Sequence, residues 1–178
     1  MAEITYFRNY GPQNTDEVIK AVRKRVERND IGAIVVASTS GTTGVKFLTE
    51  LKNRVPVVVV SHKEMQSSHK DHIIELGGKA VDKTHLPLHT EGMDDVRETF
   101  RTLGQGFKVA VEVILIAADK GLINPYQDVV GIGGTGTGAD TALIARATPT
   151  KEIFNKNENK KLEIREILAM PLKKKWWG

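Results

Sequence analysis

Apolar residues gather in short β-branched runs, which predict the strands of a sheet. The clearest runs cover residues 31–37, 55–60 and 127–132. In the first two, apolar residues occupy both the odd and the even positions, so neither face of the strand is polar. Strands of this kind are typical of parallel sheets that helices cover on both sides. Shorter strands are predicted at residues 4–7, 80–81, 141–145 and 163–170.

Between the runs, apolar residues recur three or four positions apart, as in amphipathic helices. The first helix is expected to begin at Asn14 or Thr15, with Glu17 in the position that a capping box requires. Further helices are predicted at residues 45–51, 72–76, 93–103 and 107–120. The alternation of strands and helices predicts an α/β protein with three layers. We expect one domain over residues 1–178, with a mainly parallel central sheet and helices on both faces.

Composition narrows the classes of partner. The net charge of +4 is compatible with an anionic ligand. It is too modest to indicate the concentrated basic face of a nucleic-acid-binding protein. The absence of cysteine excludes disulfides and thiolate metal sites. Residues 1–6 lack the features of a signal peptide, and Glu112 interrupts the longest apolar stretch, 109–118. We therefore expect a cytoplasmic protein with no membrane partner.

A hydroxyl-rich segment is the strongest chemical signal in the chain. It follows the strand at 31–37, precedes a helix, and consists of Ser38, Thr39, Ser40, Gly41, Thr42 and Thr43. Helix N-termini carry unpaired N–H groups and a partial positive charge, so they bind anions. An ordinary helix cap needs one hydroxyl, and this segment has several. It lacks the Gly-Lys-Ser/Thr ending of a Walker A loop. We predict a phosphate site here.

A glycine-rich segment follows the strand at 127–132. It consists of Gly133, Gly134, Thr135, Gly136, Thr137 and Gly138, and we predict that it covers the same ligand. The alternative is a plain hairpin turn. Residues 131–136 match the GxGxxG pattern, but the residues after Asp140 favour a strand rather than the helix of a dinucleotide site. Ser61 and His62 follow the strand at 55–60 and are predicted at the same ligand edge, although His62 equally suits an ordinary turn.

Three other features have competing interpretations. Glu112 could be a buried acid–base group, but Lys108 and Asp119 share its helical face, which favours an exposed polar stripe or an ion pair.

The basic tail at 173–177 ends in two tryptophans, which favour a homo-oligomer contact over nucleic-acid binding. The histidines suggest a metal cluster at first, but we expect surface positions and no metal site: His62, His69, His72, His85 and His89.

Residues 14–61, and above all 33–43, resemble the C-terminal domain of pyruvate kinase. In that family a similar hydroxyl-rich loop binds a phosphate of an allosteric sugar bisphosphate. Residues 129–145 are similar to the later strand, glycine-rich loop and strand that cover the same effector. Together with Asn14-Thr15, residues 117–119 and 138–141, and Met170-Pro171, the pattern resembles a stand-alone archaeal family of pyruvate kinase C-terminal-like proteins.

The resemblance implies that the two loops meet where the strand order of the sheet reverses. It also implies flavin mononucleotide (FMN), or a similar small phosphorylated ligand, as the bound molecule. The barrel that carries out pyruvate kinase chemistry has no counterpart here, so phosphoryl transfer to ADP is not expected. We therefore hypothesise that the protein binds a phosphate-bearing ligand, with FMN as the first candidate. The alternatives are a flavin-dependent oxidoreductase and a sensor of a phosphorylated sugar metabolite, which leaves open whether the protein is an enzyme.

Overall fold

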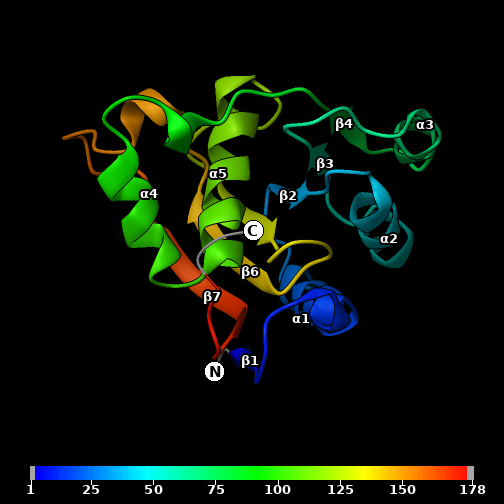
Figure 1. Ribbon diagram of the computed structural model, residues 1–178. Coiled ribbons are helices and arrows are strands. Elements are labelled where there is room, and N and C mark those ends of the chain that lie inside the picture. Colours follow the sequence, from blue (N-terminus) through cyan, green and yellow to red (C-terminus); the bar gives the residue numbers. More distant parts are fainter. Residues whose placement is uncertain (1–2, 176–178) are drawn as a thin grey trace.

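One seven-stranded sheet runs through the molecule in the order β1-β7-β6-β5-β2-β3-β4. The computed structural model describes residues 3–175 (Figure 1). Every neighbouring pair is parallel except those that include β6, which is antiparallel to both β5 and β7. The strands are β1 (Thr5–Phe7), β2 (Ala33–Ala37), β3 (Val57–Val60), β4 (Lys79–Val81), β5 (Asp128–Gly133), β6 (Thr141–Arg146) and β7 (Ile164–Pro171).

Helices cover both faces of this sheet, which confirms the predicted three-layer, mainly parallel α/β fold. On one face lie α1 (Thr15–Val26), α2 (Thr42–Leu51) and α3 (Ser67–Glu75). On the other lie α4 (Asp94–Arg101) and α5 (Gln105–Asp119), as Figure 1 shows. Short 3₁₀ helices occur at Pro12–Asn14, Pro87–His89 and Thr150–Glu152.

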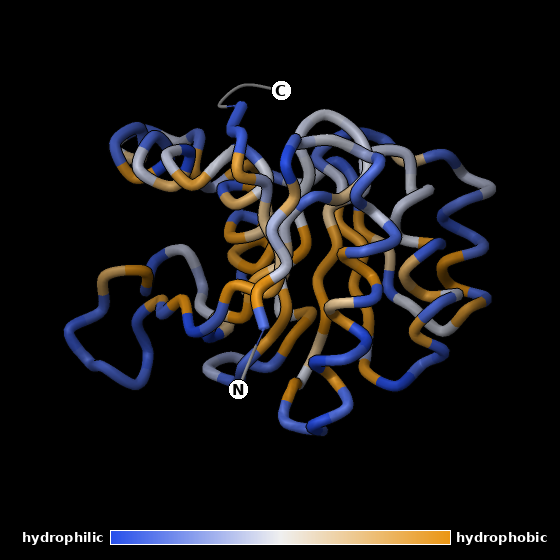
Figure 2. Tube along the Cα trace, turned by 90° about the horizontal axis from the view of Figure 1, so that it is seen from below, coloured by the Kyte–Doolittle hydropathy of each residue, from blue (hydrophilic) through white to orange (hydrophobic). Residues whose placement is uncertain are grey.

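Each side of the sheet has its own hydrophobic core. Along β2, Ile34 and Val36 pack toward α1 and α2, while Ala33 and Val35 pack toward α5. This alternation follows from the pleat of a strand, which turns successive side chains to opposite faces. Figure 2 shows hydrophobic residues concentrated along the central strands and hydrophilic residues along the outer loops. The apolar character of both strand faces is thus explained by burial on both sides.

The cap predicted for one helix and the start predicted for another differ from the structure. At α1 no side-chain cap is formed, because the Asn14 amide donates to the Asn9 carbonyl at 2.8 Å instead. The capping-box prediction is therefore wrong. Helix α3 begins at Ser67, five residues before the predicted start at residue 72. Its only fully buried residue is Ile73, so apolar spacing reveals little of its length.

The structure bears only in part on two expectations, the absence of a membrane partner and the oligomer contact of the basic tail. Within residues 3–175, no helix has both the length and the apolar character needed to cross a bilayer. The predicted oligomer contact depends on Trp176 and Trp177, which lie outside the described residues. The preceding Lys175 is placed, and its carbonyl accepts a hydrogen bond from the Gln105 amide at 2.9 Å.

Candidate functional site

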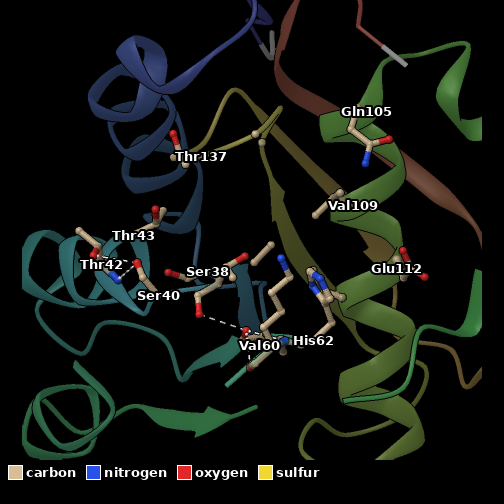
Figure 3. Close-up of a pocket in the computed structure, with 18 of the residues that line it drawn as sticks. Ser38, Ser40, Thr42, Thr43, Val60, His62, Gln105, Val109, Glu112 and Thr137 are labelled. Carbon is tan, nitrogen blue, oxygen red and sulfur yellow. Dashed lines mark hydrogen bonds between the residues drawn. The ribbon is translucent and has the colours of Figure 1, made fainter. Parts of the chain in front are cut away.

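A cavity of about 1030 Å³ opens where β2, β3 and β5 end. Because these strands are parallel, their carboxyl ends meet at one edge of the sheet. The chain leaves β2 toward α2 on one face, whereas α5 lies on the other face and leads into β5. The order of the strands reverses here, which is where open α/β sheets bind ligands. Figure 3 shows the side chains of α2 and α5 on opposite walls of this cavity.

The hydroxyl-rich loop forms the α2 wall. Ser38 is buried, and its Oγ accepts a hydrogen bond from the Gly44 amide at 3.3 Å. Ser40 Oγ accepts from the Thr42 amide at 3.3 Å and lies 2.9 Å from Thr42 Oγ1 (Figure 3). Gly41 turns the chain into α2 with a φ of 93°, and a Cβ on it would lie 2.6 Å from the Cβ of His69. Glycine is therefore required by the turn and by its neighbour.

Several backbone amides of this loop have no hydrogen-bond acceptor within residues 3–175. Within the described chain, no acceptor is found for the amides of Thr39, Ser40, Gly41 and Thr43. Lys46 and Lys63 add positive charge to the cavity lining, and Lys46 also pairs with Asp16 at 2.5 Å. Unpaired amides, a helix N-terminus and lysines together provide a favourable environment for an anion.

The glycine-rich loop connects β5 to β6 and lies beside the start of α1. The Thr15 hydroxyl accepts from the Ala139 amide at 3.0 Å, and Asp140 accepts from the Gly11 amide at 3.1 Å. Asp140 is fully buried. These contacts join the base of the loop to the start of α1, and the exposed part of the loop borders the cavity. The structure thus combines the two interpretations of this segment: it is a hairpin turn, and it borders the cavity.

Most of the predicted site residues line the cavity. They are Ser38, Thr39, Ser40, Thr42, Thr43, Ser61, His62, Gly134, Gly136, Thr137 and Gly138. Gly41, Gly133 and Thr135 are not part of this lining. Gly133 instead allows α5 to approach β5, since a Cβ there would lie 2.1 Å from the Gly106 carbonyl oxygen. Ser61 Oγ donates to the carbonyl of Lys63 at 2.8 Å and accepts from its amide at 3.1 Å, which shapes the turn after β3.

The α5 wall of the cavity was not predicted from the sequence. Here α5 contributes three apolar and three polar residues to the cavity: Val109, Val113, Ile116, Gln105, Lys108 and Glu112. Their spacing along α5 places them on neighbouring turns of one helix face. That spacing was visible in the sequence, but the direction of the face depends on how α5 packs across the sheet. Lys46 and Lys63 were also missed.

Glu112 lies in this wall and is buried, so the prediction of an exposed polar stripe is wrong and that of an ion pair is confirmed. Its carboxylate contacts the ammonium of Lys108, and both side chains are only 4% exposed. The other carboxylate oxygen accepts from the Leu88 amide at 3.1 Å. His89 Nε2 lies 2.8 Å from Lys108 Nζ. Burial lowers the pKa of Lys108, and the attraction of Glu112 opposes this effect.

The histidines do not gather. His62 lines the cavity, and its pKa is lowered by burial and by the nearby charge of Lys63. His69 donates to the Ser40 carbonyl at 2.9 Å, and His85 lies 2.9 Å from Asp119. His89 contacts Lys108, as described above. Among residues 3–175, no group of three or more metal-ligating side chains is found.

Comparison with known families agrees with this architecture. The family described as pyruvate kinase, alpha/beta domain, matches residues 16–145, which is more than half of the chain. The matched segment contains both loops and the α5 wall of the cavity. The protein therefore belongs to the pyruvate kinase α/β domain family.

Proposed function

We propose that the cavity binds a small phosphorylated ligand between the two loops, with FMN as the first candidate. The observation that carries the proposal is the polarity of the cavity. One wall presents unpaired amides and hydroxyls at the N-terminus of α2, and the opposite wall presents apolar side chains of α5. A ligand with a phosphate at one end and a flat ring at the other complements both walls.

At the phosphate end, the amides of residues 39–41 and 43 are the proposed donors. The hydroxyls of Ser40 and Thr42 already contact each other, so both are held in place beside these amides. A phosphate dianion would also be attracted by Lys46 and Lys63. The prearranged donors reduce the ordering that binding requires.

At the other end, Val109, Val113 and Ile116 offer an apolar surface, and the backbone of Gly134 and Gly136 offers close approach. FMN has a phosphate and a planar ring system, and the cavity volume is in the range of small-molecule sites. When bound, FMN would supply electron-transfer chemistry, while the chain's residues bind and orient it. A flavin-dependent oxidoreductase and a sugar-phosphate sensor are the alternative uses of this site. A cytoplasmic location stays a prediction.

The test is titration with FMN, followed by absorbance and calorimetry, in the wild type and in Thr42→Glu. Thr42 is exposed at the first position of α2, where a carboxylate suits the helix dipole. The same carboxylate would repel a phosphate, so we expect FMN affinity to fall by more than roughly tenfold.

Thr49→Glu is the matched control, because Thr49 is exposed on the same helix and does not line the cavity. It should bind FMN like the wild type. Riboflavin, which lacks the phosphate, should bind much more weakly than FMN to the wild type. Unchanged FMN affinity in Thr42→Glu, or equal binding of riboflavin and FMN, would contradict the proposal.

A further inference from the structure

Lys108, Glu112 and His89 form an ionic cluster in the α5 wall, and the Lys108–Glu112 pair within it is buried. Lys108 and Glu112 are one helical turn apart, and His89 reaches Lys108 from the 3₁₀ helix at Pro87–His89. Lys108 is only 3% exposed, as is Glu112. Burial of an ion pair costs much of what the pair gains, so apolar residues would stabilise this wall at least as well. The cluster nevertheless lines the cavity.

The surroundings of His89 and Lys108 determine which protonation form of each side chain is favoured. Burial lowers the pKa of His89, and the nearby charge of Lys108 lowers it further, so both effects favour the neutral ring. Burial lowers the pKa of Lys108, and the carboxylate in contact with it, that of Glu112, opposes this effect and favours the ammonium form. Because an ammonium has only donors, Nε2 of His89 accepts, and the neutral ring carries its proton on Nδ1.

Lys108 has one donor left over. An ammonium has three N–H groups, and the hydrogen bonds of Lys108 within the described chain go to Glu112 and His89 alone. A buried donor without an acceptor is unfavourable, and the cavity is the space that Lys108 borders. Glu112 is itself fixed by the Leu88 amide, so the ammonium is held in one place.

We infer that Lys108 donates its third hydrogen bond to an acceptor oxygen on the non-phosphate part of the ligand. This inference rests on the proposed function and adds a requirement to it. The ligand carries a carbonyl or anionic oxygen on its ring, at the end away from the phosphate. Glu112 and His89 are positioning residues that hold the ammonium of Lys108.

The test compares FMN with ribose 5-phosphate, which has the phosphate but no ring carbonyl. Lys108→Met alone would leave Glu112 buried without its partner, so both variants that are compared carry Glu112→Gln. Glu112→Gln keeps an oxygen that can accept from the Leu88 amide, and Lys108→Met/Glu112→Gln then removes only the amine. Dissociation constants for both ligands are measured by calorimetry, with thermal unfolding to verify the fold.

We expect the double variant to bind FMN roughly five- to tenfold more weakly than Glu112→Gln, because it lacks the amine that donates to the ring oxygen. Ribose 5-phosphate should bind the two variants within about twofold of each other. Glu112→Gln itself should lower the ratio of FMN affinity to ribose 5-phosphate affinity relative to the wild type. That ratio would not change if Glu112 served only the fold.

Lys20→Met is the charge control, since Lys20 is exposed on α1 and does not line the cavity. It should leave both affinities unchanged. Equal FMN affinity in the folded double variant and in Glu112→Gln would overturn the inference while leaving the proposed function intact. A parallel loss of ribose 5-phosphate would also overturn it. A wild type that binds neither ligand would instead refute the proposed function itself.

Discussion

Gly133 and Gly136 stand three residues apart in one glycine-rich segment, yet they meet different surroundings. A Cβ on Gly133 would lie 2.1 Å from the Gly106 carbonyl oxygen, which belongs to the backbone of α5. A Cβ on Gly136 would meet nothing within 4 Å, although its φ is 84°. Gly133→Ala should therefore lower the free energy of unfolding by about 3 kcal/mol through overpacking. Gly136→Ala should lower it by about 1 kcal/mol through backbone strain alone.

Denaturant unfolding of the two variants measures this difference. Equal losses, or a larger loss for Gly136→Ala, would show that α5 does not pack on β5 as closely as the structure indicates. The sequence alone could not separate the two glycines. What distinguishes them is a helix about thirty residues earlier in the chain, and only the packing of α5 against β5 brings its backbone next to Gly133.

At the scale of elements, Arg25 joins α1 to β7. Its guanidinium is 8% exposed and donates to Glu166 at 2.8 Å and to Asp30 at 2.6 Å. Arg25→Met should lower the free energy of unfolding by about 2 kcal/mol at pH 7, because Glu166 and Asp30 lose the buried guanidinium that they share. Arg23→Met is the control on the same helix, since Arg23 is half exposed and lies 3.7 Å from Glu50. It should cost less than about 0.5 kcal/mol.

The effect of Arg25 should depend on pH. Arg25 lowers the pKa of Asp30 and of Glu166 below their ordinary values of 3.8 and 4.5. Carboxyl groups with lowered pKa stabilise the fold above their unfolded pKa, and this contribution disappears as pH falls through the folded pKa. The difference between wild type and Arg25→Met should thus be full above about pH 5 and shrink below about pH 4. A difference that stays constant down to pH 2 would contradict the assignment.

Local patterns predicted most elements but not their long-range partners. The runs at 31–37 and 55–60 contain β2 and β3, since burial on both faces requires apolar residues at successive positions. The start of α1 was placed correctly, but its cap was not, because Asn14 bonds to Asn9 and Thr15 to the glycine-rich loop. That loop is far along the chain. A contact between distant segments has no signature in either one alone.

For the whole molecule, the sequence predicted one half of the cavity. The hydroxyl-rich and glycine-rich loops follow strands directly, so a parallel sheet brings both to one edge. The α5 wall could not be predicted in the same way. Glu112 interrupts an apolar helix, and this pattern fits an exposed stripe as well as a buried pair. Only the placement of α5 across the cavity from α2 shows that Lys108 and Glu112 face the ligand space.

The topology of the sheet also leads to a prediction about electron donors, provided that FMN binds. A dinucleotide site needs a glycine turn that opens a helix, whose N-terminus faces the pyrophosphate. Residues 131–136 match the glycine pattern, but the loop leads into β6, which is antiparallel to β5. The helix N-terminus at Thr42 is taken, in our proposal, by the phosphate of FMN. We therefore expect neither NADH nor NADPH to reduce the bound flavin rapidly.

Anaerobic mixing of the FMN-loaded protein with each nucleotide, followed at the visible flavin band, tests this expectation. The band should persist with both nucleotides and disappear with dithionite, which verifies that the bound flavin can be reduced. Rapid bleaching at micromolar NADH or NADPH would contradict the prediction and would favour the oxidoreductase over simple binding. A slow reaction that does not saturate would instead indicate collision with an exposed ring, because a dedicated site saturates with its ligand. The electron donor, if the flavin is redox-active, would then be another protein or another small molecule.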